Sequence, residues 1–82
     1  MPNRLIRVLL VDDDEDDFAL TRYLLADSKG GNYDLEWASS YERGLEAVLN
    51  GRHDVYLLDF RLGARSGVEL LREAQRLGGK GP

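Results

Sequence analysis

The residues best suited to chemistry in this chain of 82 residues are carboxylates that directly follow two apolar segments. Six acidic residues run from Asp12 to Asp17 after residues 9–11, and Asp59 follows residues 55–58. Like charges at this spacing repel one another unless a cation, a helix N-terminus or water offsets them. The sequence therefore indicates a positive group close to the acidic run.

The two apolar segments are predicted to be neighbouring strands of one parallel sheet. Residues 5–11 are too continuously apolar for a strand with one wet face, so this strand is expected to be covered on both faces. Neighbouring parallel strands lie about 4.8 Å apart, so Asp12, Asp13 and Asp59 can converge at one rim of the sheet. Open parallel α/β sheets usually hold their ligands at this rim.

Three converging carboxylates favour a hard cation. Mg²⁺ typically keeps several waters and takes one or two protein carboxylates together with phosphate oxygens. A carboxylate beside such an ion can also act as a nucleophile that carries a phosphoryl group, because the metal neutralises the charge that develops. Asp12, Asp13 and Asp59 thus fit an aspartyl-phosphate site. Residues 14–17, in contrast, are interpreted as acids that start a helix.

The elements that must position these acids are three predicted β-α units. Strands are expected at residues 5–11, 33–37 and 55–58, and helices at about residues 14–28, 41–49 and 68–77. The alternation of the second strand predicts an edge strand, and Leu20 and Leu24 mark the apolar stripe of the first helix. The order β-α-β-α-β-α suits right-handed crossovers in a three-layer α/β domain.

Local signals set the expected element ends. Ser39-Ser40-Tyr41-Glu42 fits the capping-box pattern before the second helix. The predicted helix stops are Lys29-Gly30-Gly31-Asn32, Asn50-Gly51 and Gly78-Gly79. Residues 60–66 are expected to form a loop, Trp37 is expected to pack against helices, and His53 is interpreted as an ordinary surface histidine.

Composition excludes several classes of protein. The chain has 11 basic and 15 acidic residues, a formal net charge of -4 and scattered basic side chains, so no nucleic-acid partner is expected. Cysteine is absent, which excludes disulfides and thiolate metal sites. No apolar run approaches the roughly 20 residues that span a bilayer. We therefore expect one cytoplasmic domain without a membrane partner.

The motifs resemble the receiver domain of two-component response regulators. The resemblance is carried by Leu10-Val11-Asp12-Asp13-Asp14, by Leu57-Leu58-Asp59-Phe60-Arg61-Leu62-Gly63 and by Gly67-Val68-Glu69-Leu70-Leu71. The separation of Asp13 and Asp59, 59 − 13 = 46 residues, suits one intervening β-α unit. The similarity covers essentially the whole chain and about the first two-thirds of a receiver domain.

The resemblance implies a fold and a set of roles. The fold would be an incomplete flavodoxin-like receiver with strand order 2-1-3, residues 1–82 forming a single partial domain of three β-α units. Asp59 would accept a phosphoryl group from a histidine kinase or phosphotransfer protein. Asp13 would bind Mg²⁺ directly, Asp12 mainly through water, and Arg61 through its backbone carbonyl. Catalysis would be limited to self-phosphorylation from small phosphodonors and autodephosphorylation.

Some departures leave alternatives open. Gly63 stands where many receivers have proline, and we assign no residue to the Ser or Thr and the Lys with which receivers hold the phosphoryl group. One alternative is an interaction module without phosphoryl chemistry. Another is a phosphotransferase enzyme, which Arg61 disfavours because a second carboxylate is expected at this position. The apolar third strand would be an exposed edge, so either residues are missing beyond Pro82 or a partner covers this edge. An isolated fragment is expected to self-associate through it.

Overall fold

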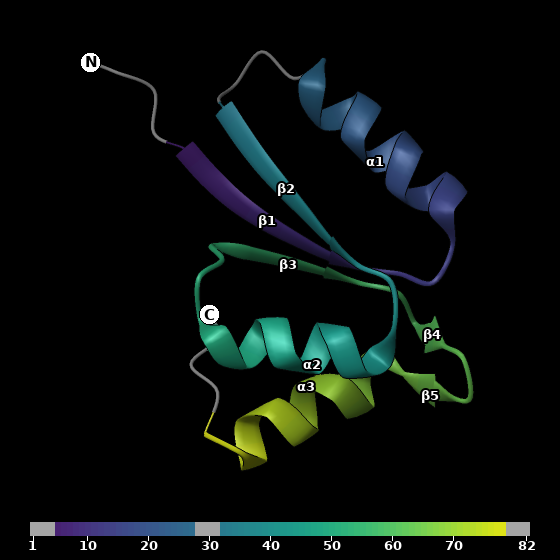
Figure 1. Cartoon of the computed structure of the whole chain (residues 1–82), viewed down its shortest axis with the longest axis vertical. Coiled ribbons are helices and arrows are strands. Elements are labelled where there is room, and N and C mark those ends of the chain that lie inside the picture. The colour runs from purple at the N-terminus through teal and green to yellow at the C-terminus, as the bar shows by residue number, and fades with distance from the viewer. Residues whose placement is uncertain (1–4, 28–31, 79–82) are drawn as a thin grey trace.

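Three parallel strands form the centre of the computed structural model, which describes residues 5–27 and 32–78 (Figure 1). In chain order the elements are β1 (Leu5–Val11), α1 (Glu15–Ala26), β2 (Asn32–Ala38), α2 (Tyr41–Asn50), β3 (Val55–Leu58), β4 (Arg61–Leu62), β5 (Arg65–Ser66) and α3 (Gly67–Arg76). The large sheet has the order β2-β1-β3, as predicted, and β4 pairs with β5 in a separate hairpin.

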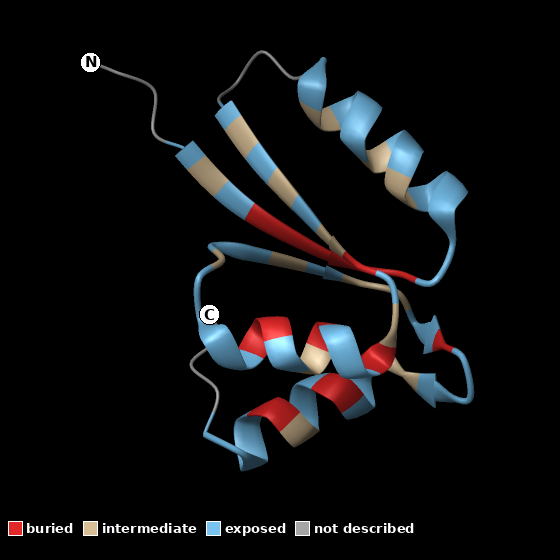
Figure 2. Ribbon diagram, in the orientation of Figure 1, coloured by how far each residue is buried: buried red, intermediate tan, exposed pale blue. Residues whose placement is uncertain are grey.

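The central position of β1 explains its sequence. Leu10 lies opposite Trp37 of β2 on one side and opposite Leu57 of β3 on the other, and both pairings are parallel. The C-terminal half of β1 is buried, as Figure 2 shows in red. A strand that has a neighbour on each side and helices on both faces needs apolar residues at consecutive positions.

The helices cover the two faces of the sheet unequally. α2 and α3 pack together below the sheet in Figure 1 and supply buried residues to the core, whereas α1 lies on the other face. The buried cluster contains Leu9, Val11, Ala38, Tyr41, Ala47, Val48, Leu62, Leu70 and Ala74. No residue of α1 is buried. The expected stripe on this helix stays exposed, with Leu20 and Leu24 each 57% accessible.

The helix starts confirm one prediction and correct another. Asp14 is the N-cap of α1 and its side chain accepts a hydrogen bond from the Asp16 amide at 2.9 Å, so the following acids do start a helix. The capping box was wrong by one residue. Ser40, not Ser39, caps α2 by accepting from the Arg43 amide at 3.2 Å. The third helical position is therefore occupied by arginine, which cannot accept the reciprocal bond.

The helix ends follow the glycine signals where the structure describes them. Gly51 ends α2 with a φ of 66°, a left-handed conformation that glycine adopts without a steric penalty. α3 ends at Arg76, just before Gly78, which has a φ of 91°. The predicted stop at residues 29–31 and Gly79 lie outside the described residues, and Asn32 begins β2.

The predicted loop at residues 60–66 contains the β4–β5 hairpin. Arg61 pairs with Ser66 and Leu62 pairs with Arg65. Strands of two residues are too short to produce a periodic sequence pattern, which is why they were missed. Leu62 is buried in the core cluster and fixes this hairpin beside the carboxyl ends of the sheet strands.

Candidate functional site

Asp12, Asp13 and Asp59 meet at the carboxyl ends of β1 and β3. A carboxylate oxygen from each residue lies within 4.8 Å of the other two. Asp12 is 6% exposed, Asp59 is half-buried and Asp13 is exposed. The structure thus brings together the three acids that the sequence singled out, although Asp59 is far from the other two along the chain.

Backbone pairing continues one residue beyond the strands and holds two of these acids. The Asp12 amide donates to the Ala38 carbonyl at 3.1 Å, and the Asp59 amide donates to the Val11 carbonyl at 2.9 Å. Both acids therefore extend the parallel ladder, and their positions depend on the register of the sheet. Parallel pairing brings the carboxyl ends of neighbouring strands to one rim.

Trp37 also positions Asp12, through a contact that was not predicted from the sequence. Its indole Nε1 donates to the Asp12 carbonyl oxygen at 2.7 Å. The indole ring stacks on Phe18 of α1, with ring centroids 4.6 Å apart and planes 7° apart, so the expected packing against a helix is confirmed. Trp37 therefore ties together β2, the start of α1 and the backbone of the acidic rim.

The Asp12 carboxylate sits among other negative charges. Burial raises its pKa above the ordinary value, and the neighbouring charges of Asp59 and Asp17 add to this effect, whereas a hydrogen bond from the Asp14 amide opposes it. That amide donates to Asp12 Oδ1 at 2.9 Å. A cation close to the three acids would remove the repulsion and favour their ionised forms.

The β4–β5 hairpin borders the site beside Asp13. The Gly63 amide donates to Asp13 Oδ2 at 3.4 Å, and Gly63 has a φ of 66°. Asp13 also lines a pocket of about 340 Å³ between the hairpin and the start of α2. The hairpin contains Arg61, two residues after Asp59. It is therefore a third element at the rim, next to the ends of β1 and β3.

Gly67 lets α3 begin close to Asp59. A Cβ atom at this position would collide with the Asp59 carbonyl oxygen. The Gly67 amide donates to the Phe60 carbonyl at 3.3 Å, and Ser66 caps the helix by accepting from the Glu69 amide at 3.1 Å. The absence of a side chain at residue 67 is therefore a structural requirement of the rim.

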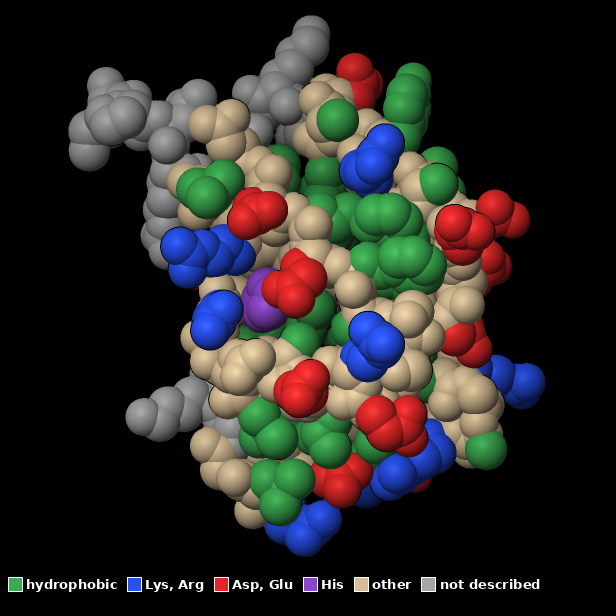
Figure 3. All heavy atoms as spheres, viewed as in Figure 1, with side chains coloured by type: hydrophobic (Ala, Val, Ile, Leu, Met, Phe, Trp, Pro, Cys, Tyr) green, Lys and Arg blue, Asp and Glu red, His purple; other side chains and the backbone are tan. Residues whose placement is uncertain are grey.

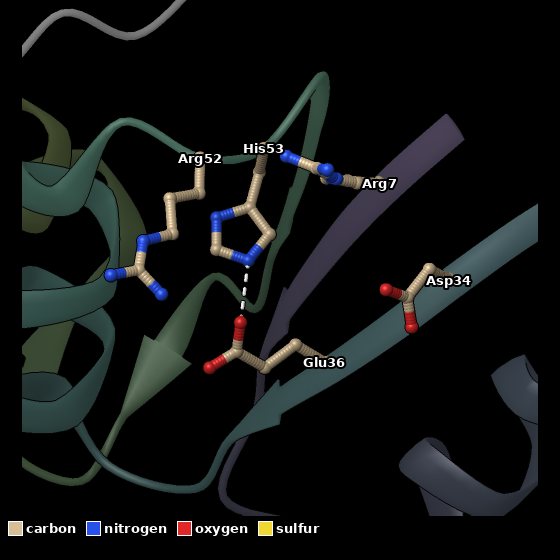
Figure 4. A pocket seen from close by; sticks show the side chains of 5 residues that line it. All are labelled: Arg7, Asp34, Glu36, Arg52 and His53. Carbon is tan, nitrogen blue, oxygen red and sulfur yellow. Dashed lines mark hydrogen bonds and ion pairs between the residues drawn. The ribbon is translucent and has the colours of Figure 1, made fainter. Parts of the chain in front are cut away.

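His53 is not the surface histidine that we expected. Its side chain is only 5% exposed, and Nε2 lies 2.7 Å from Glu36 Oε1 (Figure 4). No sequence pattern indicates this contact, because Glu36 lies 17 residues away and reaches His53 only once β2 pairs with β1. The surrounding pocket, of about 500 Å³, is lined by Arg7, Asp34, Glu36, Arg52 and His53.

This pocket does not resemble the acidic rim. It lies near the starts of β1 and β3, away from Asp12, Asp13 and Asp59, and its lining mixes two arginines with two acids. On the face shown in Figure 3, basic and acidic side chains are likewise interspersed. Among residues 5–27 and 32–78, only Asp12, Asp13 and Asp59 form a group of three potential metal ligands. Over the same residues, each helix is too short or too polar to cross a bilayer.

Two curated proteins resemble most of this chain in sequence. Two curated relatives, both named transcriptional regulatory protein DltR, come from Streptococcus agalactiae serotype III (strain NEM316) and serotype V (strain ATCC BAA-611 / 2603 V/R). Each is 37% identical over 73 residues, an alignment that covers 89% of this chain and 31% of the relative. The chain thus spans about a third of the length of the curated relatives it matches.

Solved structures share the fold. A CheY-like response regulator receiver domain protein from Methanospirillum hungatei JF-1 matches with a TM-score of 0.75 and 32% identity, over 92% of this chain and 58% of that one. The N-terminal domain of an uncharacterized protein from Wolinella succinogenes matches in fold with a TM-score of 0.71 and 22% identity, over 93% and 59% of the two chains. The flavodoxin-like fold is therefore confirmed.

The family assignment rests on nearly the whole sequence. Residues 8–82 match the family model of the response regulator receiver domain. Domains of this kind act in two-component signalling and are generally not enzymes in the ordinary sense. Because this match includes both strands that carry the acidic rim, and because a solved receiver has the same fold, the chain belongs to the response regulator receiver domain family.

Proposed function

We propose that this chain is the phosphoacceptor part of a two-component phosphorelay and that Asp59 takes the phosphoryl group. The donor would be a histidine kinase or a phosphotransfer protein, the proteins with which receiver domains generally interact. The observation that carries this proposal is the convergence of Asp12, Asp13 and Asp59 within 4.8 Å. In this proposal residues 1–82 act as one unit containing the first three β-α units of a receiver domain.

The donor atoms at the rim fit Mg²⁺. They are hard oxygens on three carboxylates, and burial and like charge already raise the pKa of Asp12. Asp13, Asp59 and the Arg61 backbone carbonyl would bind the ion directly, and Asp12 would bind it mainly through water. When bound, Mg²⁺ would neutralise the carboxylates and the charge that develops on the phosphoryl oxygens.

In the transfer step, an Asp59 carboxylate oxygen attacks the phosphorus of a phosphohistidine. A new oxygen–phosphorus bond forms, the nitrogen–phosphorus bond breaks, and its electron pair stays on the imidazole of the donor. Asp59 is half-buried rather than buried, so part of this residue is accessible from solvent. Attack of water on the aspartyl phosphate would release inorganic phosphate and restore the carboxylate, which is the expected autodephosphorylation.

Phosphorylation by a small acyl phosphate tests this proposal. The chain should gain one phosphate in the presence of Mg²⁺, as measured by intact mass, and should gain none with a chelator. Asp59→Asn should abolish labelling. Asp16→Asn is the matched control, because it removes an exposed carboxylate outside the cluster and should label like the wild type. Equal labelling of Asp59→Asn and wild type would refute the assignment.

A further inference from the structure

The β4–β5 hairpin depends on side-chain contacts to stay in place. Each of its strands has two residues, and an isolated two-stranded hairpin is at best marginally stable in water. Leu62 is 4% exposed and anchors β4 in the core. Figure 1 shows the hairpin beside the first turns of α2 and α3. The second strand, β5, therefore needs an anchor of its own, and its candidate is Arg65.

Arg65 contacts side chains of both neighbouring helices. Its guanidinium carbon lies 3.9 Å from the centre of the ring of Tyr41, the first residue of α2. Its Nη2 atom lies 3.3 Å from Glu73 Oε1 and its Nε atom 3.6 Å from Glu69 Oε2, both on α3. A guanidinium can stack on a ring and bind carboxylates together, because its charge is spread over a planar group. This one residue thus fastens β5 to α2 and to α3.

Tyr41 and Glu73 give Arg65 a firm base. Tyr41 is buried, and its hydroxyl donates to Glu73 Oε1, the same oxygen that Arg65 contacts. Burial raises the pKa of Tyr41 and the hydrogen bond to Glu73 adds to this effect, so the hydroxyl remains a donor at neutral pH. The Glu73 side chain is only 25% exposed, which limits the screening of its charge by solvent. α2 and α3 are therefore joined to each other where Arg65 attaches to them.

The turn of the hairpin touches the acidic rim. The Gly63 amide donates to Asp13 Oδ2 at 3.4 Å, and Asp13 and Arg65 line the same pocket. Leu62 of β4 pairs with Arg65 of β5. A movement of Arg65 is therefore passed to the strand segment that lies between Arg61 and Gly63. The positions of both backbone groups, the Arg61 carbonyl and the Gly63 amide, depend on how firmly Arg65 is held.

We propose that Arg65 is a positioning residue of the acidic rim, which holds the hairpin so that the Gly63 amide stays against Asp13 and the Arg61 carbonyl stays at the rim. Its effect on Mg²⁺ rests on the function proposed above, whereas its effect on the Gly63 contact does not. The charge of Arg65 by itself would repel a cation near Asp13. Removing that charge alone would strengthen Mg²⁺ binding, and removing the anchor weakens it. The two effects therefore have opposite signs.

Mg²⁺ affinity of Arg65→Met is the first test. Methionine keeps a long side chain beside the Tyr41 ring but removes both ion pairs. In a titration followed by NMR, this variant should bind Mg²⁺ about three- to tenfold more weakly than the wild type, because groups that orient metal ligands commonly contribute tenfold or more and Arg65 is half-exposed. Arg72→Met, which removes the same charge from an exposed position of α3, is the matched control and should not weaken binding. Equal or tighter binding by Arg65→Met would overturn the proposal.

Two conservative variants separate positioning from a general loss of stability. Arg65→Lys keeps a positive charge near Glu73 but loses the planar group, so it should restore part of the Mg²⁺ affinity that Arg65→Met loses. Tyr41→Phe removes the hydroxyl that donates to Glu73 and keeps the ring against which Arg65 stacks. It should lower the urea midpoint of unfolding and leave Mg²⁺ affinity unchanged. A loss of affinity in Tyr41→Phe as large as in Arg65→Met would show that affinity only follows stability, and would overturn the proposal.

A measurement without metal distinguishes this inference from the proposed function. In a chelating buffer, exchange of the Gly63 amide with water, measured by NMR, should be faster in Arg65→Met than in the wild type and in Arg72→Met. The reason is that a released hairpin opens the hydrogen bond from Gly63 to Asp13. If the wild type neither binds Mg²⁺ nor accepts phosphate, the proposed function fails, and faster exchange would still identify Arg65 as the anchor. Unchanged exchange at Gly63 in Arg65→Met would overturn the inference at any metal affinity.

Discussion

Replacing Asp12 with asparagine should stabilise the metal-free protein. Asp12 is 6% exposed, and its carboxylate lies among the charges of Asp59 and Asp17. The amide oxygen of asparagine can still accept the hydrogen bond that the Asp14 amide donates at 2.9 Å. The substitution therefore removes the repulsion and the cost of burying a charge, while the local hydrogen bond remains.

The separation of the carboxylates sets how much stability Asp12→Asn should gain. Two unit charges 4.8 Å apart repel by about 0.9 kcal/mol in a medium like water and by about 3.5 kcal/mol at an effective dielectric constant of 20. Asp13 is exposed and Asp59 only half-buried, so the lower part of this range applies. We expect Asp12→Asn to raise the free energy of unfolding by about 1 kcal/mol at pH 7, or to raise Tm by about 4–8 °C for a domain of this size.

The pH dependence gives this prediction a definite sign. The pKa of Asp12 in the folded chain is raised above 3.8. Protonated Asp12 therefore stabilises the fold below that pH, and this contribution is lost as the pH rises through the folded-state pKa. The advantage of Asp12→Asn should be small near pH 3 and should grow towards neutral pH.

Thermal unfolding in a chelating buffer between pH 3 and pH 7 measures this advantage, and Asp16→Asn serves as the control outside the cluster. Saturating Mg²⁺ should reverse this difference and make the wild type more stable than Asp12→Asn, because the variant lacks one of the three carboxylates of the site. An ion at 100 times its Kd stabilises the protein that binds it by about 2.7 kcal/mol. A loss of stability in metal-free Asp12→Asn at pH 7, or an advantage that does not change with pH, would refute the reasoning.

Two further substitutions test how the rim is positioned. Trp37→Phe keeps a ring to stack on Phe18 but removes the donor to the Asp12 carbonyl, so it should cost about 0.5–1.5 kcal/mol of unfolding free energy and weaken Mg²⁺ binding in a titration followed by NMR. Unchanged affinity would mean that this hydrogen bond does not position the site. Gly67→Ala should cost about 1–3 kcal/mol through its collision with the Asp59 carbonyl and slow labelling of Asp59; unaltered stability and labelling would show that the backbone there yields freely.

The parts of the fold that could be predicted are those in which the pattern of a segment reflects its own environment. The apolar run of β1, interrupted only by Arg7, correctly indicated a strand with neighbours on both sides, and the alternation in β2 indicated an edge. Acids placed directly after β1 and β3 had to share a rim once the strands were parallel and adjacent. The convergence of Asp12 with Asp59 follows from that placement.

The missed features depend on contacts between distant segments. Trp37 donates to a carbonyl 25 residues away, and His53 meets Glu36 across 17 residues. Neither residue has a neighbour in the sequence that reveals its partner. The exposed stripe of α1 has a similar cause. Leu20 and Leu24 have the spacing of a packed helix, but α1 packs along the edge strand β2, and within the described residues both leucines stay 57% exposed.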